Sequence, residues 1–383
     1  MTDLSQGVIL PSHLISDLKH YIVSAPLVPE SITIGLPGFS IEISTNSPVL
    51  LKTLKAYFNP VLLPDPIKTP PSLKVAAYEN HQFIDRGIQW QDWKREAGKS
   101  GRKDSFIDIE EKNETQRLIY KVKTGVLFWQ KNDTPVAVGP VEQHPNQIIN
   151  FILTQYLNEN LRQGWLLGHA AGLEIQHKGI AIAGLSGGGK STLMLHLLED
   201  GEHFISNDRL LLNTQQTARP GQFWMRGIPK QPRINPGTIV HNKRLHKLIS
   251  QERRQELLAL PTEMLRELEE KYDADVNTLY HADCFKPETE LNAFVILNWQ
   301  SDSTDNTQLK HTTLNQSPKL LEAILKSPGP FYSDSNNVFL ANQTQPDPKE
   351  YLDRLGNIPC FELTGRIDFH KARDLVLEAI QTL

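Results

Sequence analysis

One short glycine-rich run constrains the fold of this chain more than any other feature of its sequence. Residues 184–191 read Gly-Leu-Ser-Gly-Gly-Gly-Lys-Ser, which fits the pattern G-x-x-x-x-G-K-S. A short apolar stretch at 179–183 precedes the run, and apolar residues at helical spacing follow it at 193–198. This pattern binds phosphate when it lies between a strand and a helix, so the run is a Walker A loop in its required context.

The residue types of the loop follow from the chemistry of polyphosphate binding. Backbone N–H groups must surround the phosphates, and glycines let the chain turn and approach them closely. The following helix directs the positive end of its dipole at the anion, Lys190 adds a point charge, and the Ser191 hydroxyl suits Mg²⁺. The alternative is a glycine-rich turn that binds nothing. The predicted phosphate-binding residues are Gly184, Leu185, Ser186, Gly187, Gly188, Gly189, Lys190, Ser191 and Thr192.

A nucleotide site also needs an acidic group on a second strand, because Mg²⁺ prefers oxygen ligands and the nucleophile must be oriented. Residues 204–212 offer such a strand, with apolar residues on both sides of Ser-Asn-Asp-Arg. Asp208 lies 18 residues after Lys190, which leaves room for one helix and a returning strand. We predict that Asp208 is a metal ligand or the catalytic base. The alternative is an aspartate that only caps a turn at the end of a strand.

The length of 383 residues favours two domains, or one large domain with an extension. We place the boundary near Gly164, with an α+β domain at 1–164 and an α/β domain with a central sheet, which carries the loop, at 165–383. Periodicity and turn residues predict strands at 31–35, 39–43, 117–122, 125–130, 135–139, 291–299 and 358–363. They also predict helices at 49–58, 147–157 and 368–380, a surface helix pair at 251–272 that is interrupted at Pro261, and the end of a helix at 320–326.

Composition excludes several other classes of protein. Lys and Arg number 40 against 44 Asp and Glu, so the net charge of −4 provides no broad cationic surface for nucleic acid or anionic membranes. Cys284 and Cys360 have no metal-ligand spacing, and neither a disulfide framework nor a zinc site is expected. No basic leader with an apolar core and no membrane-length apolar run is found. We expect a soluble cytoplasmic protein with neither membrane nor nucleic acid as a partner.

Three segments together resemble the catalytic domain of the HPr kinase/phosphorylase family. They are residues 168–172, which read Gly-His-Ala-Ala-Gly, the loop at 184–191, and the pair Asn207-Asp208. Further segments at 226–238, 268–273 and 326–332 resemble the divergent branch called HprK-related kinase B. The resemblance implies an HPr kinase-like P-loop kinase domain, with ATP and Mg²⁺ as cofactors.

The resemblance also implies roles for individual residues. Asp208 would accept the proton of an attacking hydroxyl, and His169 would orient or tune it, although a lone histidine is as often simply packed. Ser191 and Asp208 would hold the metal. Arg226 matches the arginine of the family's Arg-Gly segment and would offset developing phosphoryl charge. The implied catalytic set is therefore Asp208, His169, Lys190 and Arg226.

Two departures from the family pattern narrow the expected activity. Asn207 replaces the first of two aspartates, which removes a negative charge from the metal site, and Trp224 stands where the family has an acidic residue. We expect an ATP-dependent kinase that acts on a hydroxyl of a protein serine or a small molecule, without HPr as substrate. The alternatives are a regulatory NTPase and a non-catalytic nucleotide-binding scaffold. The family forms hexamers, so a homo-oligomer is a further alternative to a monomer.

One basic segment near the predicted site has two interpretations. Residues 230–247 include Arg233, Lys243, Arg244 and Lys247. They form either a lid or substrate loop that faces phosphate, or a solvated loop followed by the start of a helix. Nucleic-acid recognition is disfavoured, because no aromatic residues interleave with the charges.

Overall fold

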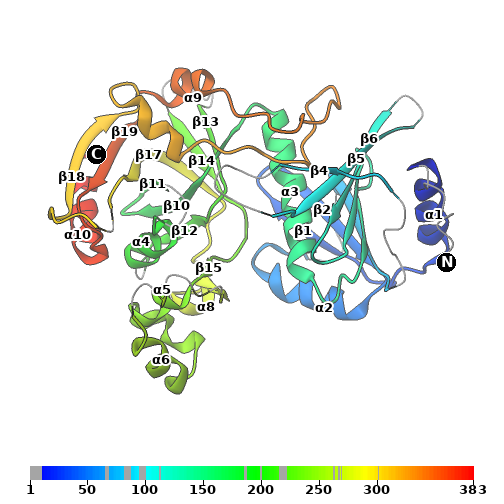
Figure 1. Ribbon diagram of the computed structural model, residues 1–383, viewed down its shortest axis with the longest axis horizontal. Helices are drawn as coiled ribbons and strands as arrows, with labels where there is room; N and C mark the ends of the chain where they lie inside the picture. Colours follow the sequence, from blue (N-terminus) through cyan, green and yellow to red (C-terminus); the bar gives the residue numbers. More distant parts are fainter. Residues whose placement is uncertain are drawn as a thin grey trace, which may run out of the picture. The chain divides into compact units, whose positions relative to one another are not determined.

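The chain divides into two compact units (Figure 1). The first contains Met1–Gln163 and Ser327–Gln345, and the second contains Gly164–Lys326 and Pro346–Leu383. The second predicted domain, at 165–383, includes residues 327–345, whereas in the structure this segment belongs to the first unit. The structure is a computed structural model, and it describes residues 11–64, 69–81, 88–94, 101–111, 114–184, 188–198, 201–214, 222–261, 264–265, 268, 270–300 and 302–383.

The first unit is built on a sheet whose described strands follow the order β1-β2-β3-β8-β7-β6-β5-β4. The predicted hairpin is confirmed, with Ile34 opposite Ile41 and Gly38 in the turn at a φ of +70°. The pairs β2–β3 and β3–β8 are parallel, and the other neighbours are antiparallel. The strands are β1 (Ile32–Leu36), β2 (Phe39–Thr45), β3 (Leu73–Glu79), β4 (Gln91–Asp92), β5 (Asp104–Glu111), β6 (Glu114–Lys121), β7 (Leu127–Gln130) and β8 (Val136–Gly139).

Helices cover both faces of this first sheet. They are α1 (Pro11–Ser24), α2 (Pro48–Tyr57), followed by the short 3-10 helix η1 (Asn59–Val61), and α3 (Pro145–Arg162). Alternate residues of a strand point to opposite faces, and β7 illustrates this. Leu127 and Trp129 pack in the cluster that contains α1, whereas the ring of Phe128 lies 4.6 Å from that of Phe151 on α3. The predicted helices at 49–58 and 147–157 are confirmed as α2 and α3.

The second unit is mixed α/β, with a sheet in the order β12-β10-β11-β17-β14-β13-β9, and with β19 and β18 following β17 on a second path. The strand β17 is parallel to β11 on one side and to β19 on the other. These strands are β9 (Leu166–Gly168), β10 (Ala170–Ile175), β11 (Lys178–Gly184), β12 (His203–Ser206), β13 (Leu210–Thr214), β14 (Phe223–Arg226), β17 (Glu288–Leu297), β18 (Gln308–Thr313) and β19 (Pro359–Thr364).

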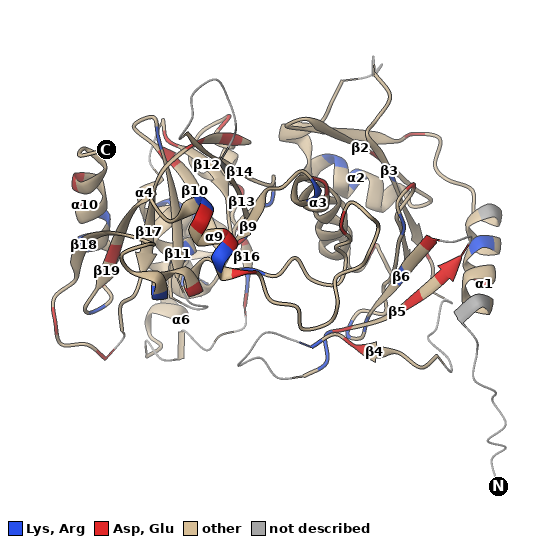
Figure 2. Cartoon of the chain, turned by 90° about the horizontal axis from the view of Figure 1, so that it is seen from above, with Lys and Arg blue, Asp and Glu red and all other residues tan. Residues whose placement is uncertain are grey.

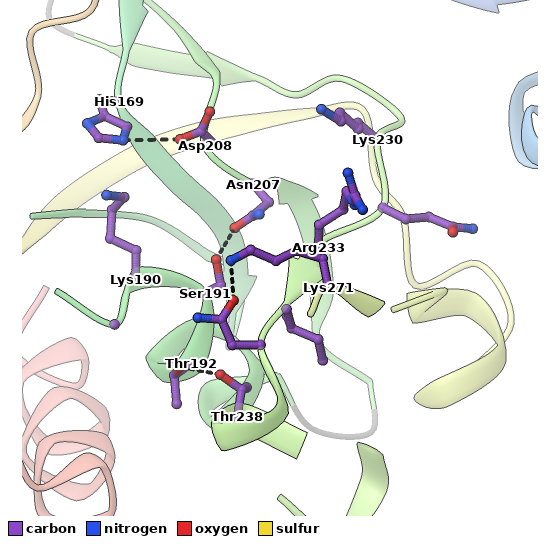
Figure 3. A pocket seen from close by; sticks show the side chains of 14 residues that line it. His169, Lys190, Ser191, Thr192, Asn207, Asp208, Lys230, Arg233, Thr238 and Lys271 are labelled. Atoms are coloured by element: carbon purple, nitrogen blue, oxygen red, sulfur yellow. Dashed lines mark hydrogen bonds and ion pairs between the residues drawn. The ribbon is translucent and has the colours of Figure 1, made fainter. Parts of the chain in front are cut away.

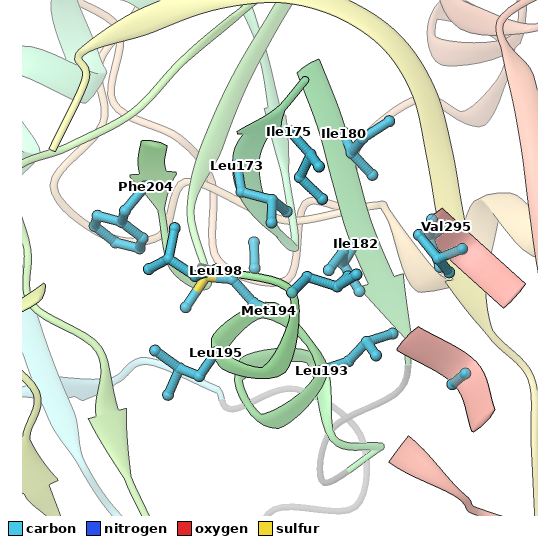
Figure 4. Close-up of a cluster of buried hydrophobic side chains, with 14 of the residues drawn as sticks. Leu173, Ile175, Ile180, Ile182, Leu193, Met194, Leu195, Leu198, Phe204 and Val295 are labelled. Atoms are coloured by element: carbon cyan, nitrogen blue, oxygen red, sulfur yellow. The ribbon is translucent and has the colours of Figure 1, made fainter. Parts of the chain in front are cut away.

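Apolar clusters on both faces hold β11 at the centre of the second unit. Ile180 and Ile182 belong to the cluster of α4 (Lys190–Leu197) and α10 (Phe369–Ile380), as Figure 4 shows for α4. Ala181 and Ala183 belong to the opposite cluster, with η3 (Pro318–Ala323) and α9 (Pro348–Leu355). Each fully buried large aliphatic side chain stabilises the fold by about 1.5–3 kcal/mol. The packing thereby fixes α4 against the strand that precedes the loop.

The remaining short elements belong to the second unit. They are β15 (Arg233–Ile234), which pairs with β16 (Tyr272–Asp273), and α5 (Pro236–Val240), η2 (Lys243–Leu248), α6 (Gln251–Leu258) and α8 (Val276–Leu279). The first helix of the pair predicted at 251–272 is confirmed as α6, whereas Tyr272 at its end lies in the strand β16. Residues 262–263, 266–267 and 269 of the predicted pair lie outside the described residues. The helix end predicted at 320–326 corresponds to the 3-10 helix η3, which already ends at Ala323, so the predicted end was wrong.

Acidic and basic residues are interspersed along the elements of both units (Figure 2). Within the described part of the chain, no helix is long and apolar enough to cross a membrane.

Candidate functional site

The predicted strand–loop–helix context is present, since β11 ends at Gly184 and α4 begins at Lys190. Leu185, Ser186 and Gly187 lie outside the described residues. Gly189 has a φ of +92°, in the left-handed region, and a Cβ built there would lie 2.6 Å from Cζ of Phe369. Only glycine satisfies both conditions without strain, so the fold itself requires this glycine.

Two aromatic residues from distant segments hold the described end of the loop. The indole Nε1 of Trp299 donates a hydrogen bond of 2.9 Å to the carbonyl oxygen of Gly188. The Trp299 ring meets Phe369 edge-on at 5.2 Å. On the loop's other side, Nζ of Lys190 donates to the carbonyl oxygen of Gly184 at 2.9 Å. Sequence reasoning missed these aromatic contacts, although Trp299 does end the predicted strand at 291–299.

A cavity of about 360 Å³ opens beside the loop (Figure 3). Its size is at the lower end of the range for small-molecule sites. The cavity brings together the described loop residues 189–192 with His169 and Asp208, which the sequence analysis had assigned to one site. The lining residues are His169, Gly189, Lys190, Ser191, Thr192, Asn207, Asp208, Lys230, Gln231, Arg233, Ile234, Asn235, Thr238 and Lys271.

Two hydroxyl groups at the start of α4 already have partners from other segments. The Ser191 hydroxyl donates a hydrogen bond of 2.8 Å to Oδ1 of Asn207. The Thr192 hydroxyl lies 2.8 Å from that of Thr238 on α5. Ser191 is therefore joined to the turn that carries Asp208, as a metal-site interpretation requires, but its partner is the neutral Asn207.

Asp208 sits in a tight turn between β12 and β13, and its φ of +72° lies in the left-handed region that aspartate tolerates better than most residues. The single strand predicted at 204–212 is therefore wrong, because this turn divides it into two strands. Nε2 of His169 lies 3.1 Å from Oδ1 of Asp208, and Nζ of Lys326 lies 3.4 Å from Oδ2. The carboxylate is held from two sides, and its side chain is still about half exposed.

The surroundings of Asp208 favour its ionised form. Loss of water around the carboxyl would by itself raise its pKa, but the hydrogen bond from His169 opposes this. The charges of Lys326, His169 and Arg209 act in the same direction, and together they hold the pKa of Asp208 well below its usual range. Asp208 is therefore a carboxylate at neutral pH.

Cations from three further positions line the cavity. Arg233 pairs with Asp273 across β15 and β16, at 3.2 Å between Nε and Oδ1, and Lys271 donates a hydrogen bond to the side-chain oxygen of Asn235. Burial lowers the pKa of Lys230 to about 8, with Arg209 and Arg233 adding to the effect and Asp208 opposing it.

Of the two interpretations of the basic segment, the cavity favours the lid or substrate loop for its first part. Lys230 and Arg233 line the cavity, whereas Lys243 is exposed and does not. Lys271 and Lys326 were not predicted as site residues, although both lie in segments, 268–273 and 326–332, that contribute to the family resemblance.

Arg226 is not brought to the cavity with the other predicted residues. It lies on β14, where its Nε donates to Oε2 of Glu288 at 2.6 Å and its guanidinium lies 4.3 Å from the ring of Trp165. It is not among the described residues that line the cavity. The observed contacts are those of an arginine that joins two strands and packs on an aromatic ring.

The oxygen donors in the cavity suit a magnesium ion that is shared with phosphates. Among the described residues, no three His, Cys, Asp or Glu side chains are grouped to hold a metal by themselves. Mg²⁺ usually takes only one or two carboxylates and completes its shell with phosphate and water. The Ser191 hydroxyl, bonded to the side-chain oxygen of Asn207, and the Asp208 carboxylate fit that requirement.

No protein-family model and no curated protein matches the chain. Among solved structures, the chain is similar to one described as the structure of the Hpr(Ser) kinase/phosphatase from Coxiella burnetii. The TM-score is 0.28 at 13% sequence identity, and the similarity covers 56% of this chain and 91% of the other. A TM-score this low decides nothing about activity, which must be argued from the residues of the site.

Proposed function

We propose that the second unit binds ATP at the loop and transfers its γ-phosphoryl group to a hydroxyl of an acceptor. The observation that carries this proposal is the ionised Asp208, held by His169 in the same cavity as Lys190 and Ser191. The proposed activity is the kinase activity that the resemblance to the HPr kinase/phosphorylase family implies, with an acceptor other than HPr.

The loop residues would bind the phosphates. The backbone amides of the loop and the Lys190 ammonium provide positive potential for the β- and γ-phosphates. Ser191 and Asp208, with Asn207 beside them, would hold Mg²⁺, which offsets charge on the transferring phosphoryl group. Lys190 would exchange its present bond to the carbonyl oxygen of Gly184 for the phosphates.

Asp208 would orient the acceptor hydroxyl and take its proton. A carboxylate with a depressed pKa is a weak base, but phosphoryl transfer has a loose transition state in which positioning and charge stabilisation dominate. His169 would act on the reaction through Asp208, by fixing the direction of the carboxylate. We infer that orientation contributes more than basicity at this position.

Two observations favour a second candidate, the non-catalytic nucleotide-binding scaffold. The partner of Ser191 is the neutral Asn207, and Arg226 is paired with Glu288 away from the cavity. Both features reduce the charge available to a metal and to the transition state. A scaffold would bind ATP tightly and show no turnover at any concentration of Mg²⁺ or Mn²⁺.

Two variants test the proposed kinase. Lys190→Ala should weaken ATP binding by a factor of about 100 or more, because it removes a charge-assisted contact to phosphate. Asp208→Asn should leave ATP affinity within about threefold and lower transfer by a factor of about 1,000. Calorimetric ATP binding and transfer from γ-labelled ATP into a host lysate are the two measurements.

The exposed Lys243→Gln is the matched control, because it removes a lysine that does not line the cavity. Full transfer by Asp208→Asn would show that the role given to Asp208 is wrong. Release of inorganic phosphate that no candidate acceptor increases would instead identify a nucleotide hydrolase with water as acceptor.

A further inference from the structure

The residues that line the cavity carry more positive charge than a phosphate-binding loop alone would provide. Its described lining contains four basic side chains besides His169, which are Lys190, Lys230, Arg233 and Lys271, and one carboxylate, Asp208. The charge of that carboxylate is already opposed by Lys326. Lys190 belongs to the loop itself, so three cations remain that the Walker A pattern does not explain.

The additional cations come from segments far from the loop and lie apart from its lysine. Lys230 and Arg233 follow β14, and Lys271 precedes β16. In Figure 3, Lys190 lies on one side of Asp208, and Lys230 and Arg233 lie on the other. In this view, a hydroxyl oriented by Asp208 would have Lys190 on one side and Lys230 and Arg233 on the other.

Lys230 differs from the other two cations in the contacts of its ammonium. Within the described residues its ammonium has no hydrogen-bond or ion-pair partner, whereas Arg233 has Asp273 and Lys271 has Asn235. The ammonium is also partly buried, which lowers the pKa of Lys230 to about 8. A partly buried cation that has no hydrogen-bond or ion-pair partner among the described residues is costly, and an anionic ligand removes that cost.

We infer that the acceptor is a small hydroxy compound with a carboxylate or phosphate group, which binds Lys230 and Arg233 while its hydroxyl faces Asp208. This inference rests on the proposed function. The acceptor oxygen forms a bond to the γ-phosphorus as the bond from that phosphorus to the β,γ-bridging oxygen breaks. ADP leaves with the bridging oxygen, and the hydroxyl proton passes to the Asp208 carboxylate and then to water.

The test measures binding of matched acceptors to the full chain in the presence of a non-hydrolysable ATP analogue. The probes are glycerate for the carboxylate, glycerol 3-phosphate for the phosphate, glycerol as the neutral counterpart, and a serine peptide with acidic neighbours. At least one of the two small anions should bind ten times or more tightly than glycerol. Comparison of the two anions identifies which group the cations recognise.

Variants connect that preference to the two cations. Lys230→Gln with Arg233→Gln should weaken binding of the preferred anion at least tenfold and leave affinity for the ATP analogue within threefold. Lys243→Gln, outside the cavity, should change neither. Each variant is first checked for a cooperative thermal unfolding transition, and the single Lys230→Gln is used if the double variant does not fold.

The outcomes separate this inference from the proposed function. If the wild type does not bind the ATP analogue, the proposed function fails. If it binds the analogue but binds both anions no better than glycerol, or prefers the acidic peptide, only the small anionic acceptor is overturned. It is also overturned if the double variant weakens the analogue as much as Lys190→Ala does, because the cations then serve the nucleotide.

Discussion

Arg117 in the first unit and Lys230 in the second show two ways in which a protein accommodates a buried or partly buried cation. The Arg117 side chain is only 2% exposed, and its guanidinium donates to both carboxylate oxygens of Asp108, at 2.5 and 2.8 Å. It also donates to the carbonyl oxygens of Pro330 and Leu340, at 3.2 and 2.9 Å. Its charge and most of its donors are used within the first unit.

Aromatic rings complete the environment of Arg117. The guanidinium lies 4.6 Å from the ring of Phe106 and 4.7 Å from that of Phe339. Lys230 differs in each respect, because it is partly exposed at a cavity and, within the described residues, has no partner for its ammonium. The comparison teaches that the first cation fastens the segment 327–345 to its own unit, whereas the second is arranged for a ligand.

The largest expected effect comes from breaking the paired cation. Arg117→Met should lower the free energy of unfolding of the first unit by about 3 kcal/mol, because it leaves Asp108 and two carbonyl groups without their donor. Urea denaturation followed by tryptophan fluorescence measures this loss. The exposed pair Arg102 and Asp92 provides the control, and Arg102→Met should cost about 0.5 kcal/mol or less. A loss below about 1 kcal/mol for Arg117→Met would contradict the structural role given to Arg117.

A smaller effect on stability is expected from His196, whose side chain is neutral at pH 7 in the folded protein. His196 on α4 stacks on Phe369, and burial, with His370, Arg373 and His241 nearby, lowers its pKa to about 4. The unfolded chain, with a pKa near 6.5, therefore binds more protons between about pH 4 and 6.5. The stabilisation that comes from keeping His196 neutral is fully present above about pH 6.5 and decreases as the pH falls towards 4.

Allowing for its partial exposure, the contribution of His196 is about 2 kcal/mol. Unfolding free energies of the wild type and His196→Gln, measured between pH 4.5 and 7.5, should converge as the pH falls. The exposed His177→Asn, which retains a residue that tolerates the positive φ at that position, should keep the wild-type dependence. Parallel curves for the wild type and His196→Gln would contradict the assignment.

The smallest expected effect has the opposite sign and concerns Lys230, whose ammonium has no partner among the described residues. The folded-state pKa of Lys230, about 8, lies below its ordinary value of 10.5, so the charged side chain costs stability at neutral pH. Lys230→Met should therefore stabilise the protein by about 1 kcal/mol at pH 7, after allowance for the water that reaches the side chain. The thermal unfolding midpoint measures the gain.

Two controls sharpen that result. The gain should shrink as the pH rises from about 8 towards 10.5, because the wild-type lysine then becomes neutral in the folded state. Inorganic phosphate should stabilise the wild type more than the variant if the cavity binds anions. A variant less stable than the wild type at pH 7 would show that Lys230 is structurally paired, as Arg117 is.

The predicted fold was most accurate where the signal is local. The hairpin at 31–35 and 39–43 combines alternating residues with a Pro-Gly turn, and both strands are present as β1 and β2. The strand β5 was missed, because it is rich in acidic residues, which disfavour strands. In the structure Arg117 and Lys121 of β6 pair with Asp108 and Asp104 of β5. The cations of the neighbouring strand therefore offset the acidic charges of β5.

The candidate site was predicted only where its residues form a local sequence pattern. A glycine run followed by Lys-Ser, and an aspartate one helix and strand later, are recognisable along the chain. The residues that hold these groups are not, because Trp299, Phe369 and Lys326 reach them from segments a hundred or more residues away. Arg226 is the opposite case. Its motif predicted a residue of the site, whereas in the structure it pairs with Glu288.

The sequence by itself determined the strand that ends at Gly184 and the helix that begins at Lys190, because apolar periodicity acts between near neighbours. Only the tertiary structure decided that Asp208 is held between His169 and Lys326, and that Lys230 and Arg233 share its cavity while Arg226 does not. Charges act over distances that are set by how strands pair and helices pack, and that pairing joins residues whose separation along the chain carries no signal.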